Sequence, residues 1–294
     1  MGDDNGLMSI LTLRRWRQRA PVVAVIRLQG VIAPSAGLRA TLSLAGLAAT
    51  LHRAFALKGV KAVALQINSP GGSPVQSALI AARIRALAGE KHLPVYAFVE
   101  DVAASGGYWL ACAADEIWAD ANSIVGSIGV ISASFGLEEF IARHGIRRRV
   151  HAAGEHKGML DPFLPENADD VARLKAMQAE IHDNFKAEVR ARRGRKLKGE
   201  EGELFSGAFW TGARAKEMGL VDGLGDLRSV MRMHYGPRVK LRLIGGQRGW
   251  LRRRLLRNEA PPLELGAGAP VAASLAAGVL AAIEERAWWG RYGL

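Results

Sequence analysis

The sequence is poor in several features that would each indicate a class of protein. Its one cysteine, Cys112, excludes an intramolecular disulfide framework and a metal site built from several cysteines. Aromatic residues make up only 6% of the 294 residues, and Asp and Glu number 28 against 40 Lys and Arg. The resulting net charge of +12 raises nucleic acid and anionic membrane surfaces as partners. A hydrophobic fraction of 49% indicates a globular protein with a basic surface and excludes a disordered one.

Long apolar runs are also scarce. Between Gly6 and Leu13 only weakly apolar residues precede Arg14, too few for a spanning helix or for the core of a signal peptide. The uncharged stretch 266–283 is mostly Ala and Gly and contains Pro270. Its few strongly apolar residues fall at helical spacing, which favours an amphipathic or docking helix over a spanning segment.

Between residues 22 and 245, short apolar runs alternate with segments of helical periodicity. The runs predict strands at 22–28, 62–67, 95–99, 117–119 and 124–131. The periodic segments predict helices at 42–57, 74–87, 105–114, 167–193, 212–218 and 224–234, with Asn167 as a cap. This alternation predicts an α/β domain with largely parallel strands over 21–245. Residues 1–20 are then a basic N-terminal arm, and 246–294 a basic, Ala/Gly-rich C-terminal extension.

Two glycine pairs lie where a predicted strand meets a predicted helix. Residues 68–72 read Asn-Ser-Pro-Gly-Gly, and such a turn leaves free backbone N–H groups that bind phosphate or stabilise an oxyanion. A plain tight turn is the alternative. Residues 104–108 read Ala-Ser-Gly-Gly-Tyr and expose Ser105 where hydrolases place a nucleophile. A helix-capping serine is the alternative there.

A base for Ser105 is harder to find. None of the seven histidines has an acidic partner in a recognisable triad arrangement. Lys157 lies between glycines at 154 and 158 and shortly before Asp161-Pro-Phe. An ordinary lysine has a pKa near ~10.4 and becomes a usable base only when burial lowers that value. A solvated surface lysine is the alternative, and His156 is a second candidate base.

Together and in this order, these segments resemble peptidase family S49, the signal peptide peptidase A type with its shorter bacterial members. The resemblance covers about residues 22–235. It rests on Asn-Ser-Pro-Gly-Gly at 68–72, Ala-Ala-Ser-Gly-Gly-Tyr at 103–108, Val-Gly-Ser-Ile-Gly-Val at 125–130, His-Lys at 156–157 with Asp-Pro-Phe at 161–163, and residues 211–222. It implies a ClpP/crotonase-like α/β fold and a serine–lysine dyad.

The resemblance also implies a role for each site residue. Ser105 attacks the peptide carbonyl, and Lys157 takes its proton and later delivers it to the leaving amine. Ser127 hydrogen-bonds and orients the lysine, and the amides of Gly72 and Gly106 form the oxyanion hole. A neutral hydroxyl suits this orienting role because an acid would hold the proton on the lysine. No cofactor or metal is implied. Family members form rings with sites at subunit contacts, so we expect a homo-oligomer.

Three features depart from the family pattern. Asp101 lies close before Ser105, and we expect its carboxylate to point away from the site. Gly158 follows the lysine where the family often has Ser or Thr. The membrane helix that is common at the family's N-terminus is not found in residues 1–20, so we expect a cytoplasmic location.

The leading hypothesis is a serine-type endopeptidase that acts on signal-peptide remnants or other membrane-derived or unfolded peptides. Residues near Val75 and Ile131 are expected to line a pocket for small apolar side chains. The alternative is a crotonase-like acyl-CoA enzyme, which would use the oxyanion amides without the serine–lysine pair. Specific nucleic-acid binding is not supported, because the sequence has no helix-turn-helix, zinc or aromatic single-strand motif.

The basic residues cluster away from the expected site, at 14–19, 147–149, 190–198 and 248–257. We therefore expect the charge to hold the protein peripherally on the inner face of an anionic membrane. Trp288 and Trp289 near the C-terminus are either interfacial anchors or pack against neighbouring residues.

Overall fold

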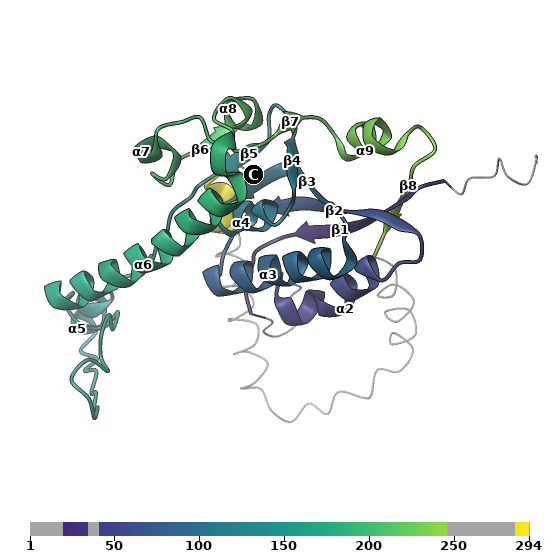
Figure 1. Ribbon diagram of the computed structural model, residues 1–294. Helices are drawn as coiled ribbons and strands as arrows, with labels where there is room; N and C mark the ends of the chain where they lie inside the picture. Colours follow the sequence, from purple (N-terminus) through teal and green to yellow (C-terminus); the bar gives the residue numbers. More distant parts are fainter. Residues whose placement is uncertain (1–19, 35–40, 246–285, 294) are drawn as a thin grey trace, which may run out of the picture.

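The computed structural model describes residues 20–34, 41–245 and 286–293. A single twisted sheet forms the centre, with helices α2 and α3 against one face and α9 at the other (Figure 1). The strands are β1 (Val22–Gln29), β2 (Val60–Ser69), β3 (Val95–Ala104), β4 (Glu116–Ala119), β5 (Ile124–Gly126), β6 (Phe209–Thr211), β7 (Gly223–Leu224) and β8 (Lys240–Leu243). The helices are α2 (Leu44–Phe55), α3 (Pro74–Lys91), α4 (Gly106–Cys112), α5 (Glu138–Arg143), α6 (Ala168–Arg193), α7 (Glu201–Leu204), α8 (Gly212–Glu217) and α9 (Leu227–Tyr235), and a short 3-10 turn, η1, spans Gly194–Lys196.

The sheet is almost entirely parallel. Its strand order is β6-β5-β3-β2-β1-β8, and β4 pairs with β3 and β7 beside this path. Only the short pair β5–β6 is antiparallel among the described strands. The prediction of an α/β fold with largely parallel strands and surrounding helices is therefore confirmed.

The core lies on both faces of the sheet because the central strands are apolar on both sides, as buried parallel strands usually are. Alternate residues of β1 and β2, such as Ile26 and Leu65, pack against α2, α3 and α4. Their neighbours, such as Val25 and Ala64, pack against α9. Cys112 is fully buried in the larger cluster, and burial raises the pKa of its thiol to about 12, so this cysteine packs as a small apolar residue.

Two predicted strands differ from the observed ones. The prediction of a strand over 124–131 is wrong beyond Gly126, because Gly126 and Ser127 both have positive φ values (116° and 52°) that end the extended conformation. The third strand continues past the predicted end at Val99, through two charged residues. Glu100 and Asp101 are accommodated because their carboxylates accept hydrogen bonds from Gln66 and Asn68 on the adjacent strand β2.

Several sequence expectations fall outside the described residues. These are the arginines of 14–19 and 248–257 and the helix expected at 266–283. The boundary at residue 245 therefore stays a prediction. Within the described ranges, no helix is both long and apolar enough to cross a bilayer.

A buried ion pair holds the C-terminal end of α6 against the sheet. Arg193 is only 3% exposed, and its Nε and Nη2 atoms donate to the Gly219 carbonyl oxygen at 3.1 and 2.7 Å. Its Nη1 atom donates to Oδ2 of Asp222 at 2.7 Å. Asp222 also accepts from the Ile117 backbone N–H and from Lys196 Nζ, both at 2.7 Å. One carboxylate thus joins α6, η1 and β4.

Replacing Asp222 by asparagine should destabilise the fold by about 3 kcal/mol, because it leaves the buried Arg193 charge unpaired. Burial raises the pKa of Asp222, but the hydrogen bonds from Arg193, Lys196 and Ile117 outweigh burial and lower it overall. The contribution of a group with a lowered pKa is present above the ordinary value near ~3.9 and is lost as the pH falls through the folded-state pKa. Urea unfolding at a series of pH values should therefore show the largest difference between wild type and variant at pH 7, and this difference should shrink as the pH falls below about 4.

Glu201→Gln is the matched control for this measurement. Glu201 pairs with Arg190 at 2.9 Å, but both side chains are exposed and solvent screens the pair, so its loss should cost much less than that of Asp222. If Asp222→Asn and Glu201→Gln lowered the free energy of unfolding equally, the buried ion pair would contribute no more to stability than the exposed one.

Candidate active site

Ser105 lies at a sharp bend where β3 ends and α4 begins. Its φ and ψ are 51° and −121°, which is an unusual conformation for a residue other than glycine. The Ser105 N–H donates to the Gly126 carbonyl oxygen at 2.8 Å, and the Ser105 carbonyl oxygen accepts from the Trp109 N–H at 3.0 Å. Backbone strain of this kind costs about 1–3 kcal/mol and is typical of functional sites.

The glycines at both junctions allow two backbone segments to meet at Ser105. A Cβ atom on Gly71, which has φ 103°, would lie 2.8 Å from both Ser105 Cβ and the Gly106 nitrogen. A Cβ atom on Gly107 would overlap the Ser69 carbonyl oxygen. Glycine at these positions therefore allows the turn at 68–72 to pack closely against the start of α4.

Two backbone amides beside Ser105 are suited to binding an anion. Ile32 bridges the turn, because its N–H donates to the Gly71 carbonyl oxygen at 2.8 Å and its own carbonyl oxygen accepts from the Ser73 N–H at 2.7 Å. This bridge does not use the Gly72 N–H. Gly106 is the first residue of α4, so its N–H has no intrahelical acceptor. Amides in this position can stabilise a developing oxyanion.

Ser127 lies beside Ser105 because two parallel strands end at the same level. Ala104 at the end of β3 is paired with Gly126 at the end of β5. Ser105 follows Ala104 and Ser127 follows Gly126, so the two serines leave the sheet next to each other. Ser127 is only 8% exposed, and its backbone N–H donates to the Ala208 carbonyl oxygen at 2.7 Å. Its Oγ atom accepts a hydrogen bond from the Tyr292 hydroxyl at 3.4 Å.

A pocket of about 220 Å³ opens in front of the two serines. It is lined by Ser105, Ser127, Gly129, Val130, Ile131, His182, Ser206, Gly207, Trp288 and Arg291. His182, from α6, is fixed by a 3.0 Å contact between its Nε2 atom and the Ile128 carbonyl oxygen. Ile131 therefore lines the pocket as expected, whereas Val75 is not among the lining residues and is 63% exposed.

Lys157 belongs to a different part of the chain. It lies in residues 132–166, which include α5 and which we call the α5 segment. This segment borders the first residues of α6 around a hollow of about 570 Å³. His182, which lines the serine pocket, lies about 20 Å along α6 from the first residue of that helix, because an α-helix rises about 1.5 Å per residue. Figure 1 shows α5 at the end of α6 that is remote from β5 and α4.

The structure therefore brings Ser105 and Ser127 to one pocket and packs Gly71, the residue before Gly72, against Ser105 and Gly106, but it does not place Lys157 in that pocket within one chain. The roles of all five residues stay predictions. Asp101 does not line the pocket either, and its Oδ2 atom accepts from Asn68 Nδ2 at 2.6 Å.

Sequence reasoning missed the contribution of His182 and of residues 288–292. The neighbouring Trp288 and Trp289 were the signal in the sequence for these C-terminal residues. Of the two alternatives given for them, packing against neighbouring residues is confirmed for Trp289. This side chain packs with Val102, Ala104, Ile124 and Tyr292 beside the serine pocket.

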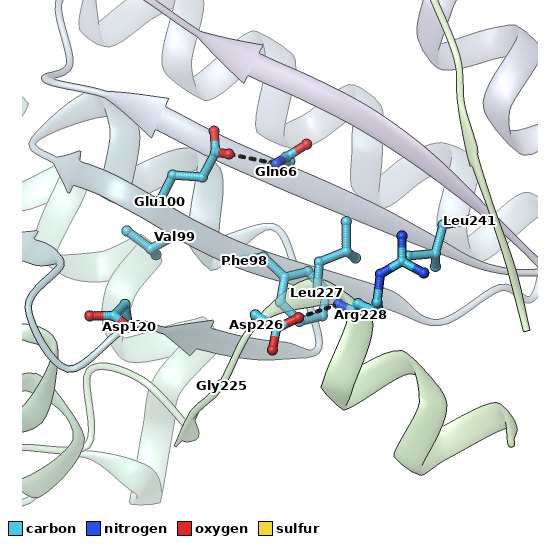
Figure 2. Close-up of a pocket in the computed structure, with 10 residues that line it drawn as sticks. All are labelled: Gln66, Phe98, Val99, Glu100, Asp120, Gly225, Asp226, Leu227, Arg228 and Leu241. Carbon is cyan, nitrogen blue, oxygen red and sulfur yellow. Dashed lines mark hydrogen bonds between the residues drawn. The ribbon is translucent and has the colours of Figure 1, made fainter. Parts of the chain in front are cut away.

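A second pocket, of about 380 Å³, lies on the face of the sheet that carries α9 (Figure 2). Gln66 and Glu100 are hydrogen-bonded on one side of it, and Arg228 extends toward Leu241 on the other. Among the described residues that line it there is no serine, cysteine, lysine or histidine. The pocket therefore lacks a nucleophile–base pair for acyl transfer.

Comparison with known proteins adds a family match. The model of peptidase family S49 matches residues 88–235. A Brucella abortus protein named Na(+)/H(+) antiporter NhaA is 53% identical over 98% of this chain and 39% of its own length. The chloroplastic serine protease SPPA of Arabidopsis thaliana is 34% identical over 58% of this chain and 25% of its own. A putative signal peptide peptidase SppA of Enterococcus faecium is 32% identical over 57% of this chain and 48% of its own.

Among solved structures, a mutant of a membrane-bound stomatin-specific protease in complex with a substrate peptide is 12% identical, with a TM-score of 0.48. The match covers 82% of this chain and all of that one, 100%. By contrast, this chain spans only about two fifths of the Brucella relative, 39%.

Proposed function

This chain belongs to peptidase family S49, and we propose that it is a serine-type endopeptidase in which Ser105 is the nucleophile. The observation that carries the proposal is the placement of Ser105. Its strained bend directly precedes Gly106, packs against Gly71 in the turn that contains Gly72, and lies at the edge of an open pocket. A nucleophile, an oxyanion site and space for a carbonyl group are the parts that acyl transfer requires.

The reaction proceeds through an acyl-enzyme. Ser105 Oγ attacks the peptide carbonyl carbon while its proton passes to the neutral amine of Lys157. The carbonyl oxygen becomes an oxyanion and accepts hydrogen bonds from the Gly72 and Gly106 N–H groups. When the intermediate collapses, the C–N bond breaks and Lys157 returns the proton to the leaving amine. A water molecule then hydrolyses the ester through the same proton transfers and regenerates Ser105.

Lys157 reaches the site from a second copy of the chain in this proposal. Within one chain it lies in the α5 segment, at the other end of α6 from the serine pocket. That segment exposes many large apolar side chains, and none of the residues of α5 is buried. The exposed ones are Phe135, Phe140, Ile146, Val150, Leu160 and Leu164. Contact between copies would cover them and bring an amine to Ser127 in a desolvated place, which favours its neutral form.

We propose peptide segments with small apolar side chains as substrates, and signal-peptide remnants or other membrane-derived or unfolded peptides as their source. The pocket is small, and Val130 and Ile131 form an apolar part of its lining. The name of the Enterococcus relative, a putative signal peptide peptidase, agrees with this substrate class. A cytoplasmic position on the inner membrane surface is part of the same proposal, and the exposed residues 147–149 are one described basic cluster that could contact it.

Peptide hydrolysis separates this proposal from the acyl-CoA alternative. The full chain is incubated with unfolded apolar peptides, and the products are identified by mass spectrometry, with a tightly folded protein as the control substrate. We expect internal cleavage after small apolar residues, no cleavage of the folded protein, and no heat of acyl-CoA binding in calorimetry. Acyl-CoA binding without peptide cleavage would favour the crotonase-like enzyme instead.

A further inference from the structure

The C-terminal residues 286–293 return to the serine pocket although they are distant from it in the sequence. Figure 1 shows this segment in yellow, beside β6 and the second half of α6. Tyr292 is only 7% exposed and meets the Phe209 ring edge-on, with 5.1 Å between ring centroids. Trp289 packs beside it against β3 and β5. The segment is therefore anchored by apolar packing on the strands that carry the two serines.

The segment forms a wall of the pocket and leaves its mouth open. Trp288 and Arg291 line the pocket together with Ser105, and about 220 Å³ remains free. The Tyr292 hydroxyl lies behind the wall and donates to Ser127 Oγ at 3.4 Å. The one side-chain hydrogen bond described for Ser127 thus comes from this segment.

We propose that Tyr292 is a positioning residue that directs the Ser127 hydroxyl toward the catalytic lysine. This inference rests on the proposed serine–lysine mechanism. The Ser127 backbone is already held, because its N–H donates to Ala208 and its carbonyl oxygen accepts from Gly129. The direction of the hydroxyl is the remaining freedom, and Tyr292 determines it.

The hydrogen-bond inventory of a serine explains the effect. A hydroxyl has one proton to donate and two lone pairs to accept with. When Tyr292 donates to one lone pair, the Ser127 O–H is turned toward the pocket as a donor. A donor offered to an amine stabilises its neutral form, and the neutral amine is the form that takes the Ser105 proton. Without Tyr292, both lone pairs are free to accept from the ammonium form and to stabilise it instead.

Other charged and titratable groups also face the pocket. These are His182 from α6, whose Nε2 atom contacts the Ile128 carbonyl oxygen, and Arg291 from the C-terminal segment. Neither is changed when only the Tyr292 hydroxyl is removed. A difference in pH dependence between wild type and Tyr292→Phe therefore reports on that hydroxyl.

Tyr292→Phe in the full chain keeps the ring contact with Phe209 and deletes the hydroxyl. We expect kcat/KM at neutral pH to fall about two- to tenfold, the range that one neutral hydrogen bond supplies. The acid limb of the kcat/KM profile should move to higher pH, and KM should change little. Tyr235→Phe is the matched control, because its hydroxyl contacts Tyr96 Oη in the cluster that packs against α9, outside the serine pocket, and its profile should equal that of wild type.

A double-mutant cycle with Ser127→Ala tests whether Tyr292 acts through Ser127. In the Ser127→Ala background, Tyr292→Phe should cause no further loss. The proposal is overturned if Tyr292→Phe lowers kcat/KM equally in both backgrounds or leaves the pH profile unshifted. It is also overturned if Tyr292→Phe raises activity, which would mean that the C-terminal segment inhibits the enzyme. If Ser105→Ala is inactive and Tyr292→Phe is normal, only the positioning role fails. If Ser105→Ala keeps full activity, the proposed peptidase mechanism itself fails.

Discussion

Ser105→Ala is expected to abolish peptide hydrolysis, with a loss of at least about 10⁴-fold in kcat. The substitution removes only Oγ, the atom that attacks the carbonyl carbon. The backbone should keep its bend, because the hydrogen bonds to Gly126 and Trp109 use main-chain atoms. Initial rates on the peptides cleaved by the wild type give the loss, and thermal unfolding checks that the variant is folded.

Ser229→Ala is the control for removal of a hydroxyl elsewhere. Ser229 lies in α9, and its side chain donates to Asp226, outside the serine pocket. This variant should keep the wild-type rate of hydrolysis. If Ser105→Ala retained a tenth or more of the wild-type rate while folded, another nucleophile would have to be sought.

Mixing two inactive variants should restore peptidase activity if the dyad forms between copies. Lys157→Ala lacks the base and keeps Ser105, whereas Ser105→Ala lacks the nucleophile and keeps Lys157. In a randomly mixed oligomer a site is complete when its serine comes from a Lys157→Ala chain and its lysine comes from a Ser105→Ala chain. Such pairing occurs in about a quarter of the sites of a large assembly and in about half of the sites of a mixed dimer, so at least about a quarter of the wild-type activity should return.

The two variants are co-expressed with different tags, and only mixed oligomers are kept by purification over both tags. Oligomers of the double variant Ser105→Ala/Lys157→Ala mixed with Ser105→Ala serve as the control and should stay inactive. If verified mixed oligomers of the two single variants were inactive while the wild type was active, the serine and lysine would have to meet within one chain. The α5 segment would then have to move along α6 toward His182.

Much of the sheet could be predicted because its signals are local. The runs that became β1, β2 and β3 are apolar on both faces, so burial between helices was their only stable environment. The start of α6 was marked by Asn167, whose side chain accepts from the N–H groups of Asp169 and Asp170. A helix cap and a repeating apolar pattern involve residues only a few positions apart, so both can be recognised in the sequence.

The ends of β3 and β5 were less predictable. Glu100 and Asp101 would normally interrupt a buried strand, but Gln66 and Asn68 on β2 donate hydrogen bonds to their carboxylates. In β5 the apolar pattern continues through Ile128 to Ile131, yet the backbone bends at Gly126 so that Ser127 can bond to Ala208. In both places, contacts with remote segments override the local pattern.

The amino-acid sequence was sufficient to predict the family, the α/β class, and the residue types that could act as nucleophile and oxyanion donors, because these depend on motif order and local turn chemistry. Which of these residues lie close together depends on the folded chain. Parallel pairing of β3 and β5 places Ser127 beside Ser105, and packing of Trp289 and Tyr292 brings the C-terminus to the same pocket. The α5 segment leaves Lys157 away from that pocket within one chain. These arrangements depend on strand register and on contacts between distant residues, which local sequence patterns do not encode.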